Sequence, residues 1–274
     1  MRNLGNYVID EFAREVLKKQ PPNLGGVYSK QIKSCGISGV EVTLDKNNYL
    51  NKPAGKYFTF EIEKYGIRTY NKLKNLIKTS LKKLLPKEYK SVLLLGMGNS
   101  FIISDTLGVK TIENVDILKL MKLKDIKIAK FAPSVFAVSG LESFDVVKSL
   151  VEHLLPDVVI VVDSLCTKEI SRLGKSFQLT DAGIVPGSAV GSKVCNLSSE
   201  TLNTKVISIG VPMVVYLNSV VLAVLDRIKP PNPIDLEALN RDLDGIDGIF
   251  SPKDIDFMID FTAKIISQAI FEAL

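Results

Sequence analysis

The stretch DVVIVVD, residues 157–163, is an unbroken apolar run with an aspartate at each end. Two similar runs are SVLLLG, residues 91–96, and KVISIG, residues 205–210, and helical sequence separates the three. Strands that are apolar on both faces are typical of buried parallel sheets, which helices cover on both sides. The runs predict an α/β fold of three layers, with a mostly parallel central sheet flanked by helices.

The sequence before these runs predicts a small N-terminal β appendage. Apolar and polar residues alternate in GVEVTLD, residues 39–45, and in KYFTFEIE, residues 56–63, and turn-forming Pro53 and Gly55 lie between them. We expect two adjacent antiparallel strands. A basic amphipathic helix follows around NKLKNLIKTSLKKLLPKEYK, residues 71–90, with its lysines on the solvated face. Nucleic-acid binding is the less favoured alternative, because no aromatic or arginine-rich platform accompanies the lysines.

Both ends of the chain carry helix signals. Residues 1 to about 20 predict a helix that ends before Pro21, and within it Asp10 suits an N-cap. Prolines at 230, 231 and 233 predict a linker. The last helix is expected to have Ser251 as its N-cap and Pro252 at its first position.

Composition narrows the class of protein. A chain of 274 residues that is 46% apolar and 24% charged can bury enough surface to form one large domain, with or without appendages. Its three cysteines have no metal-like spacing, so neither a disulfide framework nor a metal site is expected, and a cytoplasmic location is predicted. No secretion signal is recognisable, and the most apolar window, residues 211–225, is too short and too interrupted to span a membrane.

The loops at the carboxyl ends of the predicted strands are where ligands gather in such sheets. The first loop, GMGNSFIISDTLG, residues 96–108, contains Gly96, Gly98 and Asn99, and its first ionisable group is Asp105. A dinucleotide site is weakly indicated, because a third glycine is missing. The glycines more simply predict a tight turn that lets the backbone approach a substrate.

Asp163 ends the second run, and Asp105 and Asp163 therefore follow neighbouring strands at one sheet edge. Each could instead be a helix N-cap. Two carboxyl groups brought close cannot both stay ionised, so one becomes a proton donor and the other a base that activates water. This pair predicts the hydrolysis of a peptide or ester bond.

Other candidates are weaker. The single histidine, His153, is expected on a helix surface or in the core rather than paired with Cys166. The loop QLTDAGIVPGSAVGSK, residues 178–193, is consistent with the lining of a substrate groove and with a plain surface loop. Its groove candidates are Asp181, Gly183, Gly187 and Ser188.

The motifs together resemble the germination protease family of spore-forming bacteria. The resemblance rests on LLGMGNSFIISDTLG, on VVDSLCTKEISRLGKSFQLTDAGIVPGSAVGSK, and on APSVFAVSGLES, VISIGVPMVV and SPKDIDFMIDF, which occur in the family's order. It implies an atypical aspartic-type endopeptidase with Asp105 and Asp163 as catalytic residues. The chain departs from the family pattern at residues 100–104, Val185 and Tyr216, and the family's C-terminal region is longer.

The resemblance also implies the substrate. Small acid-soluble spore proteins would be cut after the Glu of Glu-Phe/Ile-Ala-Ser-Glu sites, in the cytoplasm of the spore core. The family's enzymes are self-processing zymogens, and EFARE, residues 11–15, differs from the substrate motif at one position. We therefore expect self-cleavage between Glu11 and Phe12, and a homo-oligomer.

The predicted organisation is a propeptide at 1–11, an N-terminal segment at 12–88, a catalytic core at 89–226, and a linker with the C-terminal helix at 227–274. No cofactor, metal, nucleic acid or membrane is expected as a partner. A non-catalytic paralogue that binds spore proteins is the main alternative. A third hypothesis is a hydrolase of small phosphorylated or nucleoside compounds that uses the turn at Gly96 and Gly98.

Overall fold

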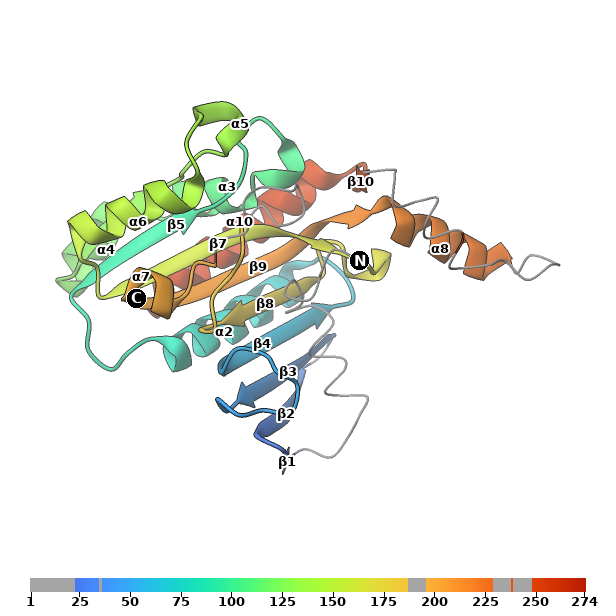
Figure 1. Ribbon diagram of the computed structural model, residues 1–274, viewed down its shortest axis with the longest axis horizontal. Helices are drawn as coiled ribbons and strands as arrows, with labels where there is room; N and C mark the ends of the chain where they lie inside the picture. The colour runs from blue at the N-terminus through green and yellow to red at the C-terminus, as the bar shows by residue number, and fades with distance from the viewer. Residues whose placement is uncertain (1–22, 35, 187–195, 229–237, 239–247) are drawn as a thin grey trace.

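The computed structural model describes residues 23–34, 36–186, 196–228, 238 and 248–274. Its centre is a sheet of ten strands in the order β1-β2-β3-β4-β8-β9-β7-β5-β6, with β10 paired to β9 (Figure 1). Helices cover both faces of the sheet, which confirms the α/β class. The predicted N-terminal helix, including Asp10, and the predicted proline linker lie outside the described residues.

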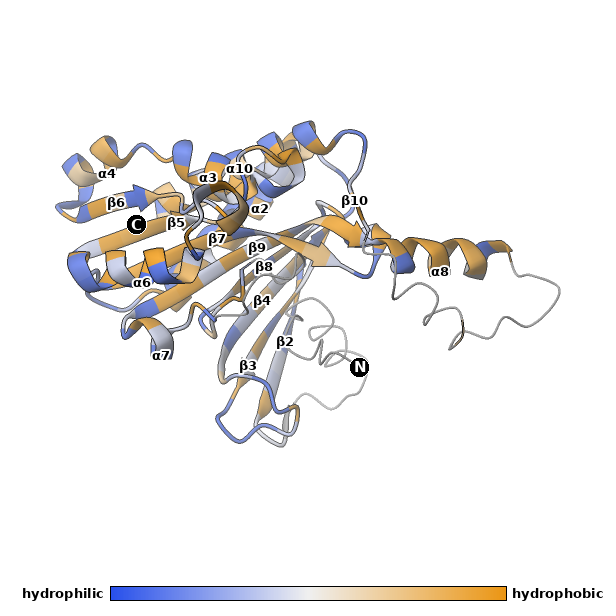
Figure 2. Ribbon diagram, turned by 45° about the horizontal axis from the view of Figure 1, so that its top comes forward, coloured by the Kyte–Doolittle hydropathy of each residue, from blue (hydrophilic) through white to orange (hydrophobic). Residues whose placement is uncertain are grey.

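The parallel part of the sheet contains the three apolar runs. Its strands are β6 (Lys127–Phe131), β5 (Ser91–Gly96), β7 (Val158–Thr167) and β9 (Lys205–Tyr216), paired in that order. Two of them are longer than the runs predict, because β7 and β9 continue to pair beyond Asp163 and Gly210, across an irregularity at Leu165 and Cys166. The strands β5, β7 and β9 form the most apolar band of the sheet (Figure 2).

The remaining strands are antiparallel, so the prediction of a mostly parallel sheet is wrong. They are β1 (Asn23–Leu24), β2 (Val27–Ser34), β3 (Ile37–Leu44), β4 (Gly55–Ile62), β8 (Ser176–Thr180) and β10 (Ile249–Phe250). The predicted hairpin is confirmed as β3 and β4. It is not an appendage, because β8 pairs with β4 on one side and with β9 on the other, which makes the sheet continuous.

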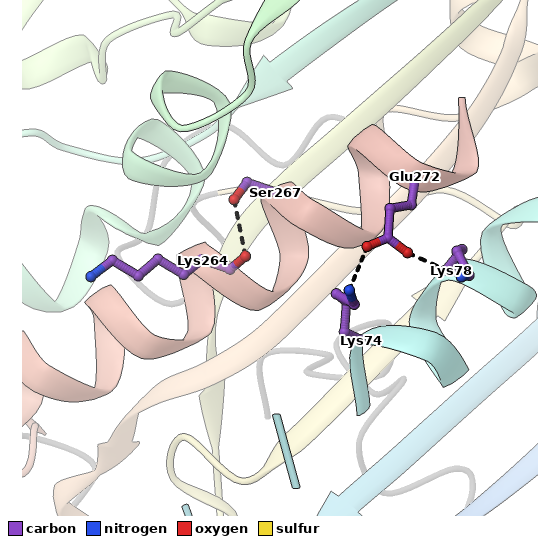
Figure 3. A network of polar contacts seen from close by, with 5 residues as sticks. All are labelled: Lys74, Lys78, Lys264, Ser267 and Glu272. Carbon is purple, nitrogen blue, oxygen red and sulfur yellow. Dashed lines mark hydrogen bonds and ion pairs between the residues drawn. The ribbon is translucent and has the colours of Figure 1, made fainter. Parts of the chain in front are cut away.

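One face of the sheet is covered by α2 (Ile67–Leu84), α3 (Leu107–Glu113) and α10 (Ile255–Ala273). The predicted basic helix is confirmed as α2, whose buried side chains recur at helical spacing. Glu272 of α10 bonds to Lys74 and to Lys78 of α2, which ties the two helices together (Figure 3). The helix α10 begins later than expected: Asp254, not Ser251, is its N-cap, and Pro252 accepts a turn hydrogen bond from Ile255.

The other face carries α6 (Ser143–Leu154) and α7 (Ser199–Leu202), which pack over a second apolar cluster (Figure 1). The helix α4 (Ile117–Lys124) lies beside β6, and α5 (Phe136–Ser139) follows β6 along the chain. From the end of β9, α8 (Leu217–Ile228) extends away from the sheet (Figure 1). No helix among the described residues has the length and apolar character needed to cross a bilayer.

Candidate active site

Asp163 lies inside β7 rather than at its end. It pairs in register with Gly210 of β9, and β7 runs on to Thr167. The N-cap alternative for Asp163 is therefore wrong: no helix begins there, and the next helical turn is the short 3-10 segment Ile170–Arg172. The side chain is 5% exposed, so its carboxyl group is almost fully removed from water.

Asp105 reaches the same region from the loop after β5. It is the last residue of a 3-10 turn, Ile103–Asp105, that contacts β7, β9 and α10. Its Oδ2 accepts a hydrogen bond from the backbone N–H of Asn99 at 2.7 Å. The N-cap of α3 is Thr106, so Asp105 does not cap that helix either. Its carboxyl group is instead held by the turn that Gly98 and Asn99 begin.

Three glycines allow this loop to fold back on the strands. A Cβ at Gly98, whose φ is +122°, would lie 1.9 Å from the carbonyl oxygen of Asp105, and one at Gly96 would lie 2.4 Å from the carbonyl oxygen of Gly108. A Cβ at Gly108 would in turn meet the carbonyl oxygens of Met97 and Val162 at 2.3 Å. The close approach at Gly96 and Gly98 is therefore to the chain itself. Gly108 is part of this packing and was not among the predicted site residues.

The same contacts bear on the phosphate-binding alternative. A glycine-rich loop that binds phosphate leaves its N–H groups open to the ligand, usually at the start of a helix. Here the space above Gly96 and Gly98 is filled by residues 105–108, and the backbone N–H of Asn99 already donates to Asp105. Among the described residues, no group of three or more histidine, cysteine or acidic side chains could hold a metal ion.

The two aspartates interact electrostatically. Burial raises the pKa of Asp105 to about 6, although the hydrogen bond from Asn99 lowers it. Burial also raises the pKa of Asp163 well above its ordinary value, and the nearby negative charge of Asp105 raises it further. The pair thus favours a state with one proton, in which the less buried Asp105 ionises first.

An exposed apolar turn precedes Asp105. Phe101, Ile102 and Ile103 are 79%, 50% and 54% exposed, which is unusual for three consecutive large apolar residues. Sequence reasoning missed this feature, although the residues stand together in NSFIISD. The turn gives the surface beside the carboxyl pair an apolar character.

Two groove candidates of the next loop, Asp181 and Gly183, lie away from the pair. Asp181 binds the Nζ of Lys205 at 2.7 Å and accepts from the backbone N–H of Lys56 at 2.7 Å, near the start of β9. Gly183 has a φ of +98° and precedes Ile184, which forms a β-bridge with Leu197. The expected loop begins later than residue 178, because residues 178–180 belong to β8.

The remaining predicted residues divide into two groups. Gly187, Ser188, Glu11 and Phe12 lie outside the described residues. His153 is exposed at the end of α6, which precedes β7, whereas Cys166 lies near the far end of that strand, so the two do not form a catalytic pair. Within the described chain, the fold brings Asp105 and Asp163 together, and the predicted residues Gly96, Gly98 and Asn99 form the loop that packs around Asp105.

Comparison with known proteins identifies the family. A model of the family described as germination protease matches residues 8–229. A germination protease from Geobacillus sp. (strain WCH70) is 36% identical over 219 residues, which cover 74% of this chain and 58% of the relative. Those from Bacillus cytotoxicus and Bacillus mycoides are 33% and 31% identical and cover 77% of this chain.

The chain spans about three fifths of the length of these relatives, with 58%, 63% and 62% of each covered. The family match nevertheless includes both aspartates and every strand of the sheet except β10. The chain therefore belongs to the germination protease family.

Proposed function

We propose that the protein is an endopeptidase of spore germination that uses Asp105 and Asp163 as an aspartic-type acid–base pair. The observation that carries this proposal is the raised pKa of both carboxyl groups, with the charge of one acting on the other. Perturbed and coupled acids of this kind cluster at catalytic sites. The family relationship supports peptide hydrolysis as the reaction.

The proposed chemistry needs one proton on the pair. Ionised Asp105, the less buried group, removes a proton from a water molecule, whose oxygen attacks the carbonyl carbon of the scissile bond. Protonated Asp163 donates its proton to the departing amide nitrogen as the C–N bond breaks. The products are a carboxylic acid and an amine, and one proton remains on the pair, now on Asp105, so a proton transfer restores the starting state.

Small acid-soluble spore proteins are the proposed substrates, cut after Glu in sites like Glu-Phe/Ile-Ala-Ser-Glu. This part of the proposal rests on the family relationship. The exposed apolar turn at residues 101–103 supports it, because an apolar side chain next to the cleaved bond could pack there. The protein would act in the cytoplasm of the spore core, as a homo-oligomer.

The test is cleavage of a peptide that contains Glu-Phe-Ala-Ser-Glu by wild type and by the Asp105→Asn and Asp163→Asn variants. We expect each variant to lose at least about 1000-fold in kcat/KM, because general acid–base groups contribute on this scale. Asp145→Asn, a change at an exposed aspartate of α6, is the matched control and should cleave normally. Folded Asp105→Asn and Asp163→Asn proteins that cleave as fast as wild type would refute the assignment.

The pH profile of kcat/KM should be bell-shaped. The rate should rise as Asp105 ionises, around its pKa of about 6, and fall at higher pH as Asp163 loses its proton. Removing Asp105 should abolish the rising limb of any residual activity. Peptide binding without cleavage at any pH would instead favour the non-catalytic paralogue.

Self-processing is a further part of the proposal. The segment EFARE, residues 11–15, lies outside the described residues but offers an acidic residue followed by an apolar one, as the substrate motif does. A tethered segment is present at high effective concentration, so cleavage between Glu11 and Phe12 should be efficient. N-terminal sequencing should find a mature chain that begins at Phe12 in wild type and not in Asp163→Asn. Equal processing in both would rule out an intramolecular cut by this site.

A further inference from the structure

The described residues contain a groove of about 360 Å³ between α2 and the β2–β3–β4 edge of the sheet, away from the aspartates. Ile32 and Leu76 contribute apolar surface to it, and Lys30, Lys33 and Lys83 are the basic residues that line it. The one acid among its lining residues, Glu41, is bonded to Lys83 at 2.7 Å. Lys30 and Lys33 are exposed and form no ion pair with any described residue.

The groove exists because α2 covers only part of its face of the sheet. Phe58 and Phe60 of β4 are fully buried. On the same face of β2, Lys30 is exposed and Ile32 is half-buried. Of the basic residues of α2, only Lys83 lines the groove, and it is bonded to Glu41, so the positive charge of the groove comes mainly from the lysines of β2. A positive, partly apolar groove remains open along the strand edge.

The edge of β2 offers a second kind of contact. It pairs with β1 at Val27 and Tyr28, and from Ser29 to Ser34 its outer edge has no described strand beside it. Unpaired N–H and C=O groups on such an edge can bind an extended peptide by adding a strand. Lysines on the edge would oppose a second copy of β2 through charge repulsion, but they would attract an acidic strand.

We propose that this groove is an exosite for an acidic, extended segment of the polypeptide substrate, distant from the bond that is cut. The inference rests on the proposed peptidase function for the role of the segment. A nucleic acid fits less well, because the groove has an apolar floor and its open backbone edge has the geometry for another polypeptide strand. The exosite would select long substrates over short ones.

The sheet sets the length of chain needed to reach both places. Five strand spacings separate β2 from β7 in the sheet order, which corresponds to roughly 24 Å at about 4.8 Å per strand. An extended peptide covers about 3.3 Å per residue, so the acidic segment must lie at least about eight residues from the cleaved bond. A peptide that contains only the cleavage motif cannot occupy both.

The first experiment measures binding without catalysis. The Asp163→Asn protein is titrated into a fluorescein-labelled peptide of about 12 residues in which Glu and Val alternate, and the fluorescence anisotropy is recorded. Replacing Lys30 and Lys33 by Glu together should weaken binding about ten-fold, and replacing both by Gln should give a smaller loss. The control replaces exposed Lys122 and Lys124 of α4 by Glu, which changes the net charge equally and should leave binding unchanged.

Three results would overturn the exosite: no peptide binding by the parent protein, equal losses in the groove and control variants, or tighter binding of a short DNA duplex that competes for the groove.

The second experiment compares kcat/KM for a short motif peptide and for a long one with a distant acidic segment. The Lys30 and Lys33 variants should lose about ten-fold on the long substrate and nothing on the short one. If no protein cleaves either peptide, the peptidase proposal fails while the binding result still decides the exosite.

Discussion

The parallel and antiparallel halves of the sheet differ in how their strands are buried. In the parallel half, β7 and β9 are buried along almost their whole length, on both faces. In the antiparallel half, β2 and β3 alternate between buried and more exposed residues. A strand that is covered on both faces can form part of a reactive site only where a loop or a polar residue within the strand reaches the site. A strand that is covered on one face can bind a partner with its other face. The aspartates lie in the first half and the lysine groove in the second.

The largest expected effect comes from removing core volume in the parallel half. Ile160 of β7 is 1% exposed, and Ile160→Ala should lower the free energy of unfolding by about 4 kcal/mol, because it leaves a cavity between sheet and helices. Ile32→Ala, at the half-buried edge of the antiparallel half, should cost about 1 kcal/mol. Urea unfolding curves measure both, and equal losses would contradict the contrast between the halves.

The glycine contacts of the loop after β5, residues 96–108, give the next effect. Gly108→Ala should cost about 3 kcal/mol, because a Cβ there would lie 2.3 Å from two backbone oxygens that strands β5 and β7 hold in place. Gly66→Ala is the matched control: nothing lies within 4 Å of its Cβ, and the change should stay within about 1 kcal/mol. Thermal unfolding in parallel with the cleavage assay would show whether activity is lost with stability. A harmless Gly108→Ala would mean that the loop does not pack this closely.

The pH dependence of stability tests the burial of the carboxyl pair. Asp105 has a pKa of about 6 in the folded protein and about 4 when unfolded, so the folded state binds its proton more tightly. The free energy of unfolding therefore falls as pH rises from about 4 to about 6, by roughly 3 kcal/mol for this group. The Asp105→Asn variant has no such carboxyl group, so its free energy of unfolding should not show this decrease.

The stability difference between Asp105→Asn and wild type should therefore favour the variant more at pH 7 than at pH 3.5. Asp145→Asn, at an exposed site, should show no such trend. Denaturant unfolding at a series of pH values measures the difference. A constant difference across this range would indicate that Asp105 titrates normally and would weaken the proposed pair.

The smallest expected effect concerns the contact that joins α2 to α10. The hydrogen bond from Lys74 and the one from Lys78 hold the pKa of Glu272 below its ordinary value, so the contact stabilises the fold above the unfolded pKa and is lost as pH falls. Glu272→Gln should cost under about 1 kcal/mol at pH 7, because the carboxylate is partly exposed. The cost should shrink in high salt and near pH 3. A loss as large as that of Ile160→Ala would show that charge, not packing, holds the helices together.

Much of the local structure was predictable from residue patterns. Alternation in residues 39–45 and 56–63 predicted β3 and β4, and the helical spacing of apolar residues predicted α2, because both patterns are set by which side chains share one face. The glycines and Asp105 were identified as one loop, and Asp163 as a second acid on a neighbouring strand. Pattern alone could not show that Gly108 also belongs to that packing.

Strand partners were not predictable in the same way. The segment SFQLT, residues 176–180, pairs with β4 and with β9, and this insertion turns the expected appendage into the other half of one sheet. Pairing of this kind depends on contacts between distant parts of the chain, for which no local signal exists. For the same reason the extension of β7 past Asp163 was missed, since it depends on β9 being there to pair with Ser164 to Thr167.

The sequence by itself determined the α/β class, the family resemblance and the two acids, because apolar runs, turn residues and motifs are properties of neighbouring residues. Only the tertiary structure decided that Asp105 and Asp163 share one electrostatic environment and that Asp181 does not. The charge that one carboxyl group feels from another depends on their separation and burial in space, and both are set by strand register and by the fold of the glycine loop.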